Sequence, residues 1–403
     1  MENVKYLIIG AGAAGLTVAN RLKEYGEDSV LLLEKAETVG GLCRSTEVDG
    51  SPLDIGGGHF LDTRRADVTE YLFRFMPETE WNRFERNSKI SLNGRMVDHP
   101  LEANIWQLEL EDQIEYLKSI AQAGCNTGEA EPEAFIRWIY WKLGKRIAED
   151  YMIPYNQKIF CGNLDQLGTY WLDKLPDVSF EETLRSCLTH KAYGKEPGHS
   201  VFYYPKKYGY GKLWELMGDR ISACVLKNKQ VKKISSNEKN VFCTDGSAFH
   251  GTYIINTAPW DTFELPDAPD NVIEAIKALK HSSVQIEYIP ENMDSDAQWI
   301  YYPEKALRYH RILLRHNFCP ESKGYWTETN SERKDKNKKA AFSYLNEYAY
   351  PLNTIEKPQA IELILRWAET KSIIGLGRWG EFQHFNSDVT VERALALARR
   401  LTL

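Results

Sequence analysis

The hydrophobic pattern of the N-terminal residues predicts a strand, a helix and a second strand in succession. Residues 6–9 form an uninterrupted apolar run, which is typical of a parallel strand buried on both faces. Apolar positions recur at helical spacing from about 14 to 25, and Gly26 is a natural stop for that helix. A second apolar run, 29–33, follows directly. This order predicts an α/β fold that begins with a βαβ unit.

Further along, the pattern changes from helical to strand-like. Residues about 105–195 have helical periodicity, and 134–145 form an aromatic-rich helix. From about residue 219, short apolar runs bounded by turn residues predict strands. The predicted strands cover residues 223–226, 231–234, 241–244, 253–256, 284–289 and 299–302. A last helix, 389–401, follows Asp388, whose carboxylate is expected to cap the helix or to face a ligand.

Composition and charge narrow the possible classes of function. Of the 403 residues, 43% are hydrophobic, and the formal net charge is −7. The hydrophobic content is typical of a globular protein, and the negative net charge does not indicate a nucleic-acid-binding surface. We interpret the basic run 333–339 as a solvated loop. No apolar run approaches the roughly 18 residues of a membrane span, and the first strand begins too early to leave room for a signal peptide. Seven cysteines without a Cys-x-x-Cys pair favour free thiols in the cytoplasm over disulfides or a metal site.

A glycine-rich turn, Gly10-Ala11-Gly12-Ala13-Ala14-Gly15, joins the first predicted strand to the first helix. In this spacing Gly10 permits a tight turn, Gly12 lets the backbone approach a pyrophosphate, and Gly15 lets the helix lie close to the strand. The start of the helix offers N–H groups to phosphates. Glu34 ends the second strand, 24 residues after Gly10, and is expected to accept hydrogen bonds from ribose hydroxyls. The segment therefore predicts a dinucleotide site.

Two further glycine turns favour FAD over NAD. Gly40-Gly41-Leu42-Cys43-Arg44 comes soon after Glu34 and Lys35, and Gly56-Gly57-Gly58-His59 follows a few residues later. A stretched FAD needs backbone amides near its pyrophosphate, ribityl chain and ring, whereas NAD does not need two more close-approach loops. The pattern predicts FAD as the cofactor, and tight turns of an ordinary α/β protein are the alternative interpretation.

Together these segments resemble the flavin amine oxidase and protoporphyrinogen oxidase superfamily, and within it the UDP-galactopyranose mutase family, particularly its eukaryotic-type branch. More segments similar to that family follow in the same order along the chain. They include Pro100-Leu101-Glu102-Ala103-Asn104, Pro154-Tyr155-Asn156-Gln157-Lys158, Phe202-Tyr203-Tyr204-Pro205, Tyr301-Tyr302-Pro303-Glu304, Tyr309-His310-Arg311, Ala349-Tyr350-Pro351, Gly377-Arg378-Trp379-Gly380 and Asn386-Ser387-Asp388. The resemblance implies a Rossmann-type, glutathione-reductase-like FAD-binding domain interleaved with a helical and mixed-sheet substrate-binding domain. The implied FAD domain covers 1–65, 196–280 and 350–403, and the implied substrate domain covers 66–195 and 281–349.

The resemblance also assigns residues to the cofactor. Val231 is expected beside the adenine, and the segments around Arg378 and Asn386 are expected to close the flavin site. The expected FAD contacts are Gly10, Gly12, Ala13, Ala14, Gly15, Glu34, Lys35, Gly41, Leu42, Arg44, Gly57, Gly58, His59, Val231, Gly377, Arg378, Asn386 and Asp388.

The mutase resemblance implies a redox-neutral reaction on a nucleotide sugar. In that family N5 of the reduced flavin attacks the anomeric carbon, UDP leaves, and the sugar ring opens and recloses as pyranose or furanose. NAD(P)H usually supplies the electrons. The diphosphate must be held by arginines and tyrosines, and the resemblance assigns Arg311 to it. It places Arg378 closer to the FAD than to the substrate, and His59 in the turn that faces the flavin ring, where it could tune N5. Arg311, His59 and Arg378 are therefore the expected catalytic groups. The expected substrate contacts are Tyr155, Asn156, Phe160, Tyr204, Tyr302, Arg311, Tyr350 and His384.

Departures from the family keep other readings open. His384 stands where mutases carry a second phosphate-binding tyrosine, Phe160 replaces a tryptophan, and Lys174 stands near the position of a substrate arginine. The third glycine turn is one residue longer than in the family. A different nucleotide sugar, an FAD-dependent oxidoreductase of the amine oxidase type, or a scaffold without turnover are the alternatives. Within the site, Arg311 could form a surface ion pair, Tyr350 could be a core residue, and His59 could be a neutral, hydrogen-bonded histidine.

Overall fold

In the computed structural model, which describes residues 2–162, 164–172, 175, 177–195, 197–335 and 340–403, the N-terminal apolar run forms a central strand. This strand, β1 (Glu2–Ile9), pairs in parallel with β2 (Val30–Leu33) on one side and β13 (Ala248–Asn256) on the other. The full order of this first sheet is β10 (Val225–Leu226), β2, β1, β13, β12 (Asn240–Cys243) and β11 (Val231–Ser235), with β19 (Ile373–Gly375) also paired to β13.

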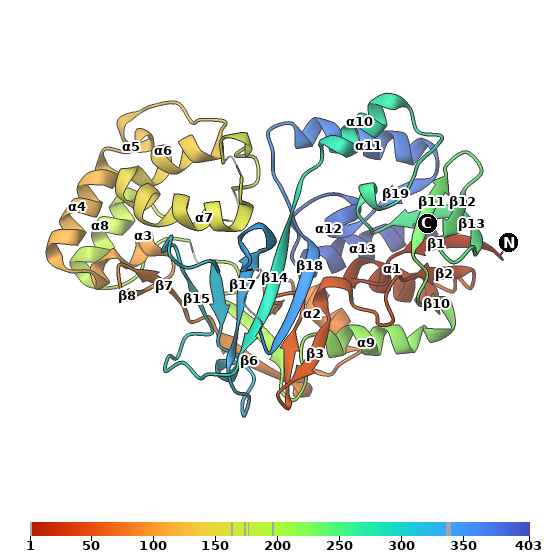
Figure 1. Cartoon of the computed structure of the whole chain (residues 1–403), viewed down its shortest axis with the longest axis horizontal. Helices are drawn as coiled ribbons and strands as arrows, with labels where there is room; N and C mark the ends of the chain where they lie inside the picture. The colour runs from red at the N-terminus through yellow and green to blue at the C-terminus, as the bar shows by residue number, and fades with distance from the viewer. Residues whose placement is uncertain (1, 163, 173–174, 176, 196, 336–339) are drawn as a thin grey trace.

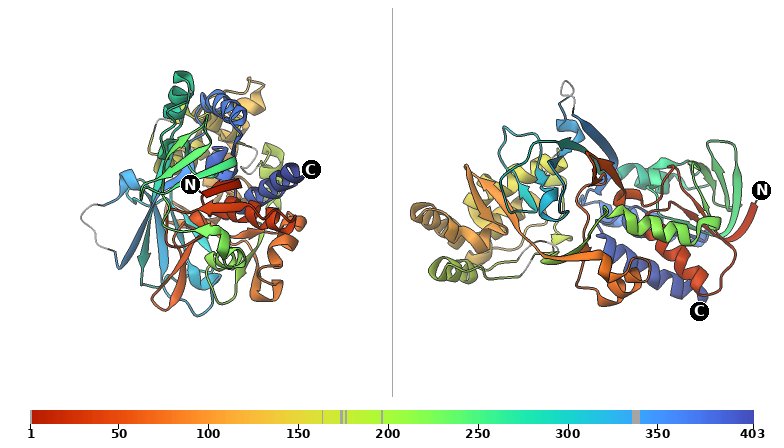
Figure 2. Two further views of the ribbon diagram at one scale, coloured as in Figure 1. Left: turned by 90° about the vertical axis from the view of Figure 1, so that its right-hand side faces the viewer. Right: turned by 90° about the horizontal axis from the view of Figure 1, so that it is seen from below.

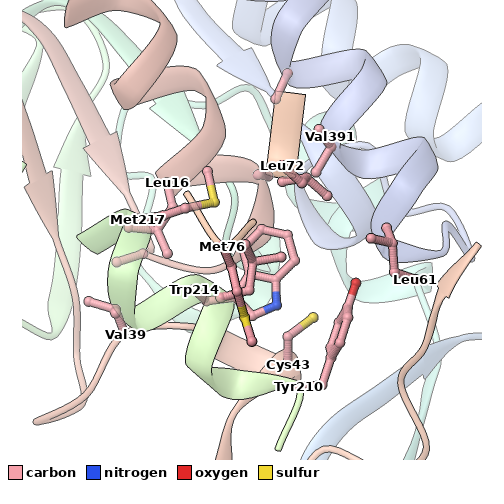
Figure 3. Close-up of a cluster of buried hydrophobic side chains, with 14 of the residues drawn as sticks. Leu16, Val39, Cys43, Leu61, Leu72, Met76, Tyr210, Trp214, Met217 and Val391 are labelled. Carbon is pink, nitrogen blue, oxygen red and sulfur yellow. The ribbon is translucent and has the colours of Figure 1, made fainter. Parts of the chain in front are cut away.

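Helices cover both faces of the first sheet. They are α1 (Ala13–Glu24), α9 (Gly211–Arg220) and α13 (Ser387–Thr402) on one face, and α10 (Asp270–Ala278) and α11 (Lys357–Thr370) on the other. Tyr6 and Ile8 pack into the first group, part of which Figure 3 shows, whereas Leu7 and Ile9 pack into the second. Because side chains of a strand alternate between faces, the continuous apolar run places β1 in a buried middle layer.

A second sheet lies between the first sheet and a separate group of helices (Figure 1). Its order is β18 (Phe342–Pro351), β14 (His281–Ile289), β17 (Tyr325–Asn330), β16 (Arg311–Leu313), β15 (Trp299–Tyr301), β7 (Ser88–Leu92) and β8 (Arg95–Asp98). Neighbouring strands are antiparallel except β15 and β7, which run in parallel. The sheet is therefore mixed, and residues more than 200 positions apart in the sequence pair in it, such as Trp299 with Ser88.

The separate group of helices lies at the end of the molecule far from both termini, as the views in Figure 2 confirm. Its members are α3 (Leu101–Asn104), α4 (Leu110–Ala121), α5 (Gly124–Thr127), α6 (Phe135–Ile147), α7 (Ile153–Phe160) and α8 (Phe180–Thr189). Residues of α3, α4, α6, α7 and α8 share one hydrophobic cluster with β7 and β8. Helix α6 has a kink at Gly144, whose φ is 72°.

The remaining elements connect these parts. They are β3 (Ser45–Val48), β4 (Ser51–Asp54), β5 (Leu61–Asp62), β6 (Trp81–Glu85), β9 (Val201–Pro205), α2 (Ala66–Phe73) and α12 (Gly377–Gly380). Strand β9 pairs with both β5 and β6 in a small three-stranded sheet.

The α/β fold class predicted from the sequence is confirmed, and most predicted elements lie within two or three residues of their predicted bounds. The last helix begins at Ser387 instead of residue 389, so Asp388 lies inside its first turn. The division into two domains stays a prediction; α2, which falls just after its first boundary, packs against α13. Across the described ranges, the structure contains no helix with both the length and the apolar character needed to cross a membrane.

Candidate functional site

The first cavity, about 510 Å³, lies where β1 and β2 end and α1 begins. This is the edge of the sheet at which the three glycine turns meet: Gly12 of the first turn forms a bridge with Gly40 of the second. Twelve of the predicted cofactor residues line the cavity: Gly10, Gly12, Ala13, Ala14, Glu34, Lys35, Gly41, Leu42, Arg44, His59, Val231 and Arg378. Segments predicted from separate motifs are thus brought together around one cavity.

Two local features prepare the first cavity for a dinucleotide. Helix α1 begins without a side-chain cap, so its first N–H groups are available to a ligand phosphate. The Glu34 carboxylate accepts hydrogen bonds from Ala11 N at 2.8 Å and Ala36 N at 2.9 Å, which hold it at the cavity wall. Gly15 does not line the cavity; a Cβ there would lie 1.9 Å from Gly10 O, so its role is the close packing of α1 on β1.

The second sheet also contributes to the first cavity. Tyr344 to Tyr348 of β18 form part of its wall, and Arg44 donates a hydrogen bond of 2.7 Å to the Tyr344 hydroxyl. This contact could not be predicted from the sequence, because Tyr344 lies 300 residues from Arg44 along the chain. The first cavity is consequently closed by both sheets.

The second cavity, about 350 Å³, extends from the third glycine turn to the helices α3, α6 and α7. It shares His59, Arg378 and Ser387 with the first cavity, so the two spaces adjoin. The predicted residues that line it are Gly58, His59, Tyr155, Asn156, Arg311, Tyr350, Arg378, His384 and Asn386. Burial raises the pKa of the Tyr155 and Tyr350 phenols, so both keep a proton that they can donate.

Arg311 forms a buried ion pair with Glu328. Its Nη2 and Nε lie 2.5 and 3.0 Å from Glu328 Oε2, and Glu328 is fully buried. Burial alone would raise the pKa of Glu328, but the charge of Arg311 and the contact with His310 outweigh it and hold that pKa below its ordinary value. The other carboxylate oxygen accepts a hydrogen bond of 3.0 Å from Gly58 N. The surface ion pair considered for Arg311 is thereby excluded, and Glu328 ties the third glycine turn to β17.

Arg378 has a different environment. It donates hydrogen bonds to Phe385 O at 2.8 and 3.1 Å and to Ala349 O at 3.1 Å, and no carboxylate of the described chain pairs with it. Burial lowers its pKa. Arg86 is similar: its partners are Ser88, Gly198 O, His99 and Tyr301, with no acidic group among the described residues. The second cavity therefore has an excess of positive charge that a bound anion would offset.

His59 is neutral. Its Nδ1 lies 2.9 Å from Gly57 O, and burial followed by the charge of Arg378 lowers its pKa to about 4. Because a carbonyl oxygen can only accept, Nδ1 carries the hydrogen and Nε2 is left as an acceptor. The neutral, hydrogen-bonded histidine considered from the sequence describes this side chain, which nevertheless lines both cavities.

Several predicted residues lie outside both cavities, and the structure gives a reason for each. Tyr204 is fully buried and donates a hydrogen bond of 3.0 Å to Asp54 Oδ2. The ring of Tyr302 packs against Tyr309. Phe160 lies behind the cavity wall, next to Trp171, which lines the second cavity. Gly57 and Gly377, with φ of 95° and 77°, shape turns without lining a cavity. Lys174 lies outside the described residues.

Asp388 neither caps the last helix nor reaches a cavity. Asn386 is the N-cap residue, and it makes no side-chain cap hydrogen bond. The Asp388 carboxylate instead forms an ion pair with Arg65 and is 1% exposed. A carboxylate buried in this position needs a positive charge nearby, and Arg65 supplies it. The prediction that Asp388 caps the last helix is therefore wrong, because its side chain forms an ion pair instead.

Some residues of the second cavity were missed from the sequence. Arg86, His99, Glu102 and Tyr301 line it, and Glu328 supports Arg311 from behind. Glu328 could have been suspected, because a charged residue in an aromatic strand needs a buried partner. Glu102 lies in a segment that resembled the family, but nothing in the local pattern distinguished Arg86 from a surface arginine. The described residues contain no cluster of three or more His, Cys, Asp or Glu side chains that could hold a metal ion.

This fold and its two adjoining cavities define an α/β protein with a Rossmann-like part and a second, mixed-sheet part. Residues 8–76 match the model of the family described as NAD(P)-binding Rossmann-like domain. Over its whole length the chain is similar to a particular member of this class, the Klebsiella pneumoniae protein named probable UDP-galactopyranose mutase, with 20% identity over 99% of this chain and 94% of that protein. A solved structure of reduced UDP-galactopyranose mutase superimposes with a TM-score of 0.88 and 22% identity, covering 100% of this chain and 94% of that one.

Other relatives share the fold or its first part. Cyclohexylamine oxidase from Brevibacterium oxydans IH-35A superimposes with a TM-score of 0.67 and 14% identity over 99% of this chain and 100% of that one. The chain spans half or less of the length of the first curated relatives that it matches. It is 49% identical over 53 residues to an uncharacterized protein of Methanothermococcus thermolithotrophicus, which is 13% of this chain and 50% of that protein. It is 38% identical over 69 residues to coproporphyrinogen III oxidase of Mycobacterium bovis, which is 17% of this chain and 15% of that protein. The predicted resemblance to UDP-galactopyranose mutase is confirmed in fold.

Proposed function

We propose that the chain binds FAD in the first cavity and a nucleotide sugar in the second, and that it acts as a flavin-dependent isomerase similar to UDP-galactopyranose mutase. The observation that carries the proposal is the set of half-buried guanidinium groups in the second cavity, beside its junction with the first, of which two have no carboxylate partner in the described chain. Arg311 has Glu328 as a partner, whereas Arg378 and Arg86 have no carboxylate partner in the described chain.

The first cavity fits an FAD. It combines uncapped N–H groups at the start of α1, the fixed carboxylate of Glu34 and closely approaching glycine backbone. Dinucleotides need these three features for their phosphates, ribose and extended chain. When bound and reduced, FAD supplies a nucleophilic nitrogen in its ring. NAD(P)H remains our predicted source of electrons.

The chain's own residues would hold and orient the substrate. A diphosphate carries at least two negative charges, and it would offset Arg378 and Arg86 while Arg311 contributes a further donor. The phenols of Tyr155 and Tyr350, which keep their protons, can donate to phosphate oxygens. A buried wall of this kind also excludes water from the reacting sugar. His384, which stands where mutases carry a tyrosine, packs against Tyr350, with the ring centroids 4.9 Å apart.

The alternative is an FAD-dependent oxidoreductase of the amine oxidase type. The aromatic end of the second cavity and the shared fold with cyclohexylamine oxidase favour it. A cationic amine would find one carboxyl group in this cavity, Glu102, but it would also meet the like charges of Arg86 and Arg378, neither of which has a carboxylate partner among the described residues. The balance of charge therefore favours an anionic substrate and the isomerase.

The test is to reduce the purified protein with dithionite, offer it nucleotide sugars, and follow pyranose–furanose conversion by chromatography. The proposal expects conversion only after reduction, with NAD(P)H as an alternative reductant. Arg86→Met should raise the KM or abolish conversion, whereas Arg83→Met, an exposed arginine in the same segment, should not. Turnover of an amine with release of peroxide and without prior reduction would overturn the proposal in favour of the oxidoreductase.

A further inference from the structure

The second cavity contains a buried carboxyl group that no step above uses. Glu102 of α3 lines the cavity with only 7% of its surface exposed. Within the described ranges it forms no hydrogen bond or ion pair with another residue. Burial raises its pKa, and the charge of Lys142 offsets only part of that rise. A carboxylate buried without a hydrogen-bond partner is unfavourable on general grounds. A ligand that brings hydrogen-bond donors to Glu102 would remove this cost.

The walls around this end of the cavity are aromatic. Trp138 and Trp171 both line it, and their indole N–H groups are already used, by Glu131 at 3.1 Å and by Gly168 O at 2.7 Å. What they contribute to the cavity wall is therefore aromatic surface and not a free N–H donor. Tyr155 adds another ring, and helix α6, which carries Trp138, contacts α3. Flat aromatic walls are suited to a planar ring system.

A hydrogen-bond donor lies three residues before Glu102. His99 lines the same cavity, and its Nδ1 is 3.1 Å from Arg86 Nη2. Burial, and then the charge of Arg86, lowers the pKa of His99 well below its ordinary value, so its ring is neutral. A guanidinium can only donate, so Nδ1 accepts and the hydrogen lies on Nε2. One short segment thus provides a neutral N–H donor and a carboxylate acceptor to the cavity.

Building on the proposed function, we infer that the nucleotide of the substrate carries guanine, with Glu102 accepting hydrogen bonds from its N1–H and N2–H groups and His99 donating to its O6. Guanine presents two adjacent donors beside one acceptor, which complements this pair of side chains. Uracil presents a single N–H between two carbonyl oxygens. One of those oxygens would face an ionised carboxylate, so a uracil nucleotide would lose affinity at this position.

The experiment compares GDP with UDP in calorimetric titrations of the purified holoprotein. Hydrogen bonds to the correct base edge typically discriminate by about 1–3 kcal/mol, so GDP should bind about fivefold to 150-fold more tightly than UDP. Glu102→Gln replaces one acceptor by a donor, so the preference for GDP should fall to within about threefold. Glu111→Gln, at an exposed position on α4, is the matched control and should leave it unchanged.

The outcomes separate the inference from the proposed function. If UDP binds as tightly as GDP or more tightly to the wild-type protein, the guanine inference is overturned while the nucleotide-sugar proposal stands. If the preference for GDP survives in Glu102→Gln, Glu102 does not read the base, and the inference is again overturned. If neither nucleotide binds to the folded holoprotein, both the inference and the proposed function fail.

Discussion

Replacing Arg311 by methionine tests the buried ion pair on which the second cavity depends. The substitution removes the charge, keeps much of the side-chain volume, and leaves Glu328 fully buried beside an apolar group. Removing one partner of a buried pair destabilises a protein by about 3–5 kcal/mol. Arg311 is 19% exposed, and Glu328 keeps its hydrogen bond from Gly58 N, so we expect a value near the lower limit, about 3 kcal/mol.

The pH dependence of this loss follows from the pKa of Glu328. In the wild-type protein Arg311 holds that pKa below its unfolded value, so the pair stabilises the fold above about pH 4.5 and the stabilisation is lost as the pH falls. Without the arginine, burial raises the folded pKa of Glu328 instead. The variant is then penalised most at neutral and higher pH, and the difference between the two proteins should shrink as the pH approaches 4.

Urea titrations at pH 8, 7, 6, 5 and 4 give the free energy of unfolding of each protein. Arg308→Met is the control: Arg308 is 54% exposed, its partner Asp335 is 3.5 Å away, and such surface pairs contribute less than about 1 kcal/mol. The double variant Arg311→Met, Glu328→Gln should recover part of the loss. A loss below about 1 kcal/mol for Arg311→Met, or a loss that does not change with pH, would refute the electrostatic reasoning.

Three further perturbations test the first cavity and its edge. Glu34→Gln should release the dinucleotide on desalting, measured by flavin absorbance, whereas the exposed Glu37→Gln should retain it; equal retention would remove Glu34 from the site. Gly15→Ala places a Cβ 1.9 Å from a carbonyl oxygen and should destabilise the fold by more than about 3 kcal/mol. Gly26→Ala lies in open space but at positive φ, so it should destabilise the fold by only about 1 kcal/mol. Similar losses for the two variants would contradict the close packing of α1 on β1. Because the pKa of His59 is lowered from 6.5 to about 4, the free energy of unfolding of the apoprotein should fall by up to about 3 kcal/mol as the pH drops from 6.5 to 4. His59→Gln should flatten that part of the dependence of stability on pH. An unchanged dependence would show that the ring is not buried as a neutral group.

Much of the fold was predictable because its first part is governed by local patterns. A continuous apolar run specifies a strand buried on both faces, and the glycine spacing specifies the turn between that strand and α1. Close approach of α1 to β1 allows only glycine at residue 15, so the sequence carries that contact directly. The charged end of β2 at Glu34 is likewise a local signal for the ribose.

The walls of the second cavity were less predictable, because their chemistry depends on distant partners. Arg311 and Tyr350 were expected in a site, but that Glu328 would anchor both Arg311 and Gly58 could not be read from either segment alone. Tyr204 and Tyr302 had the same motif-based support and became core residues, because Asp54 and Tyr309 take up their polar or aromatic contacts.

The sequence by itself determined the dinucleotide-binding turn, the order of the elements and the general resemblance, since these depend on neighbours within a few tens of residues. The tertiary structure alone decided which charges are paired and which are left for a ligand. Arg378, Arg86 and Glu102 line the second cavity and form no ion pair among the described residues. Both properties arise when segments up to 300 residues apart come together, because a low-dielectric surrounding forms only after the chain has folded.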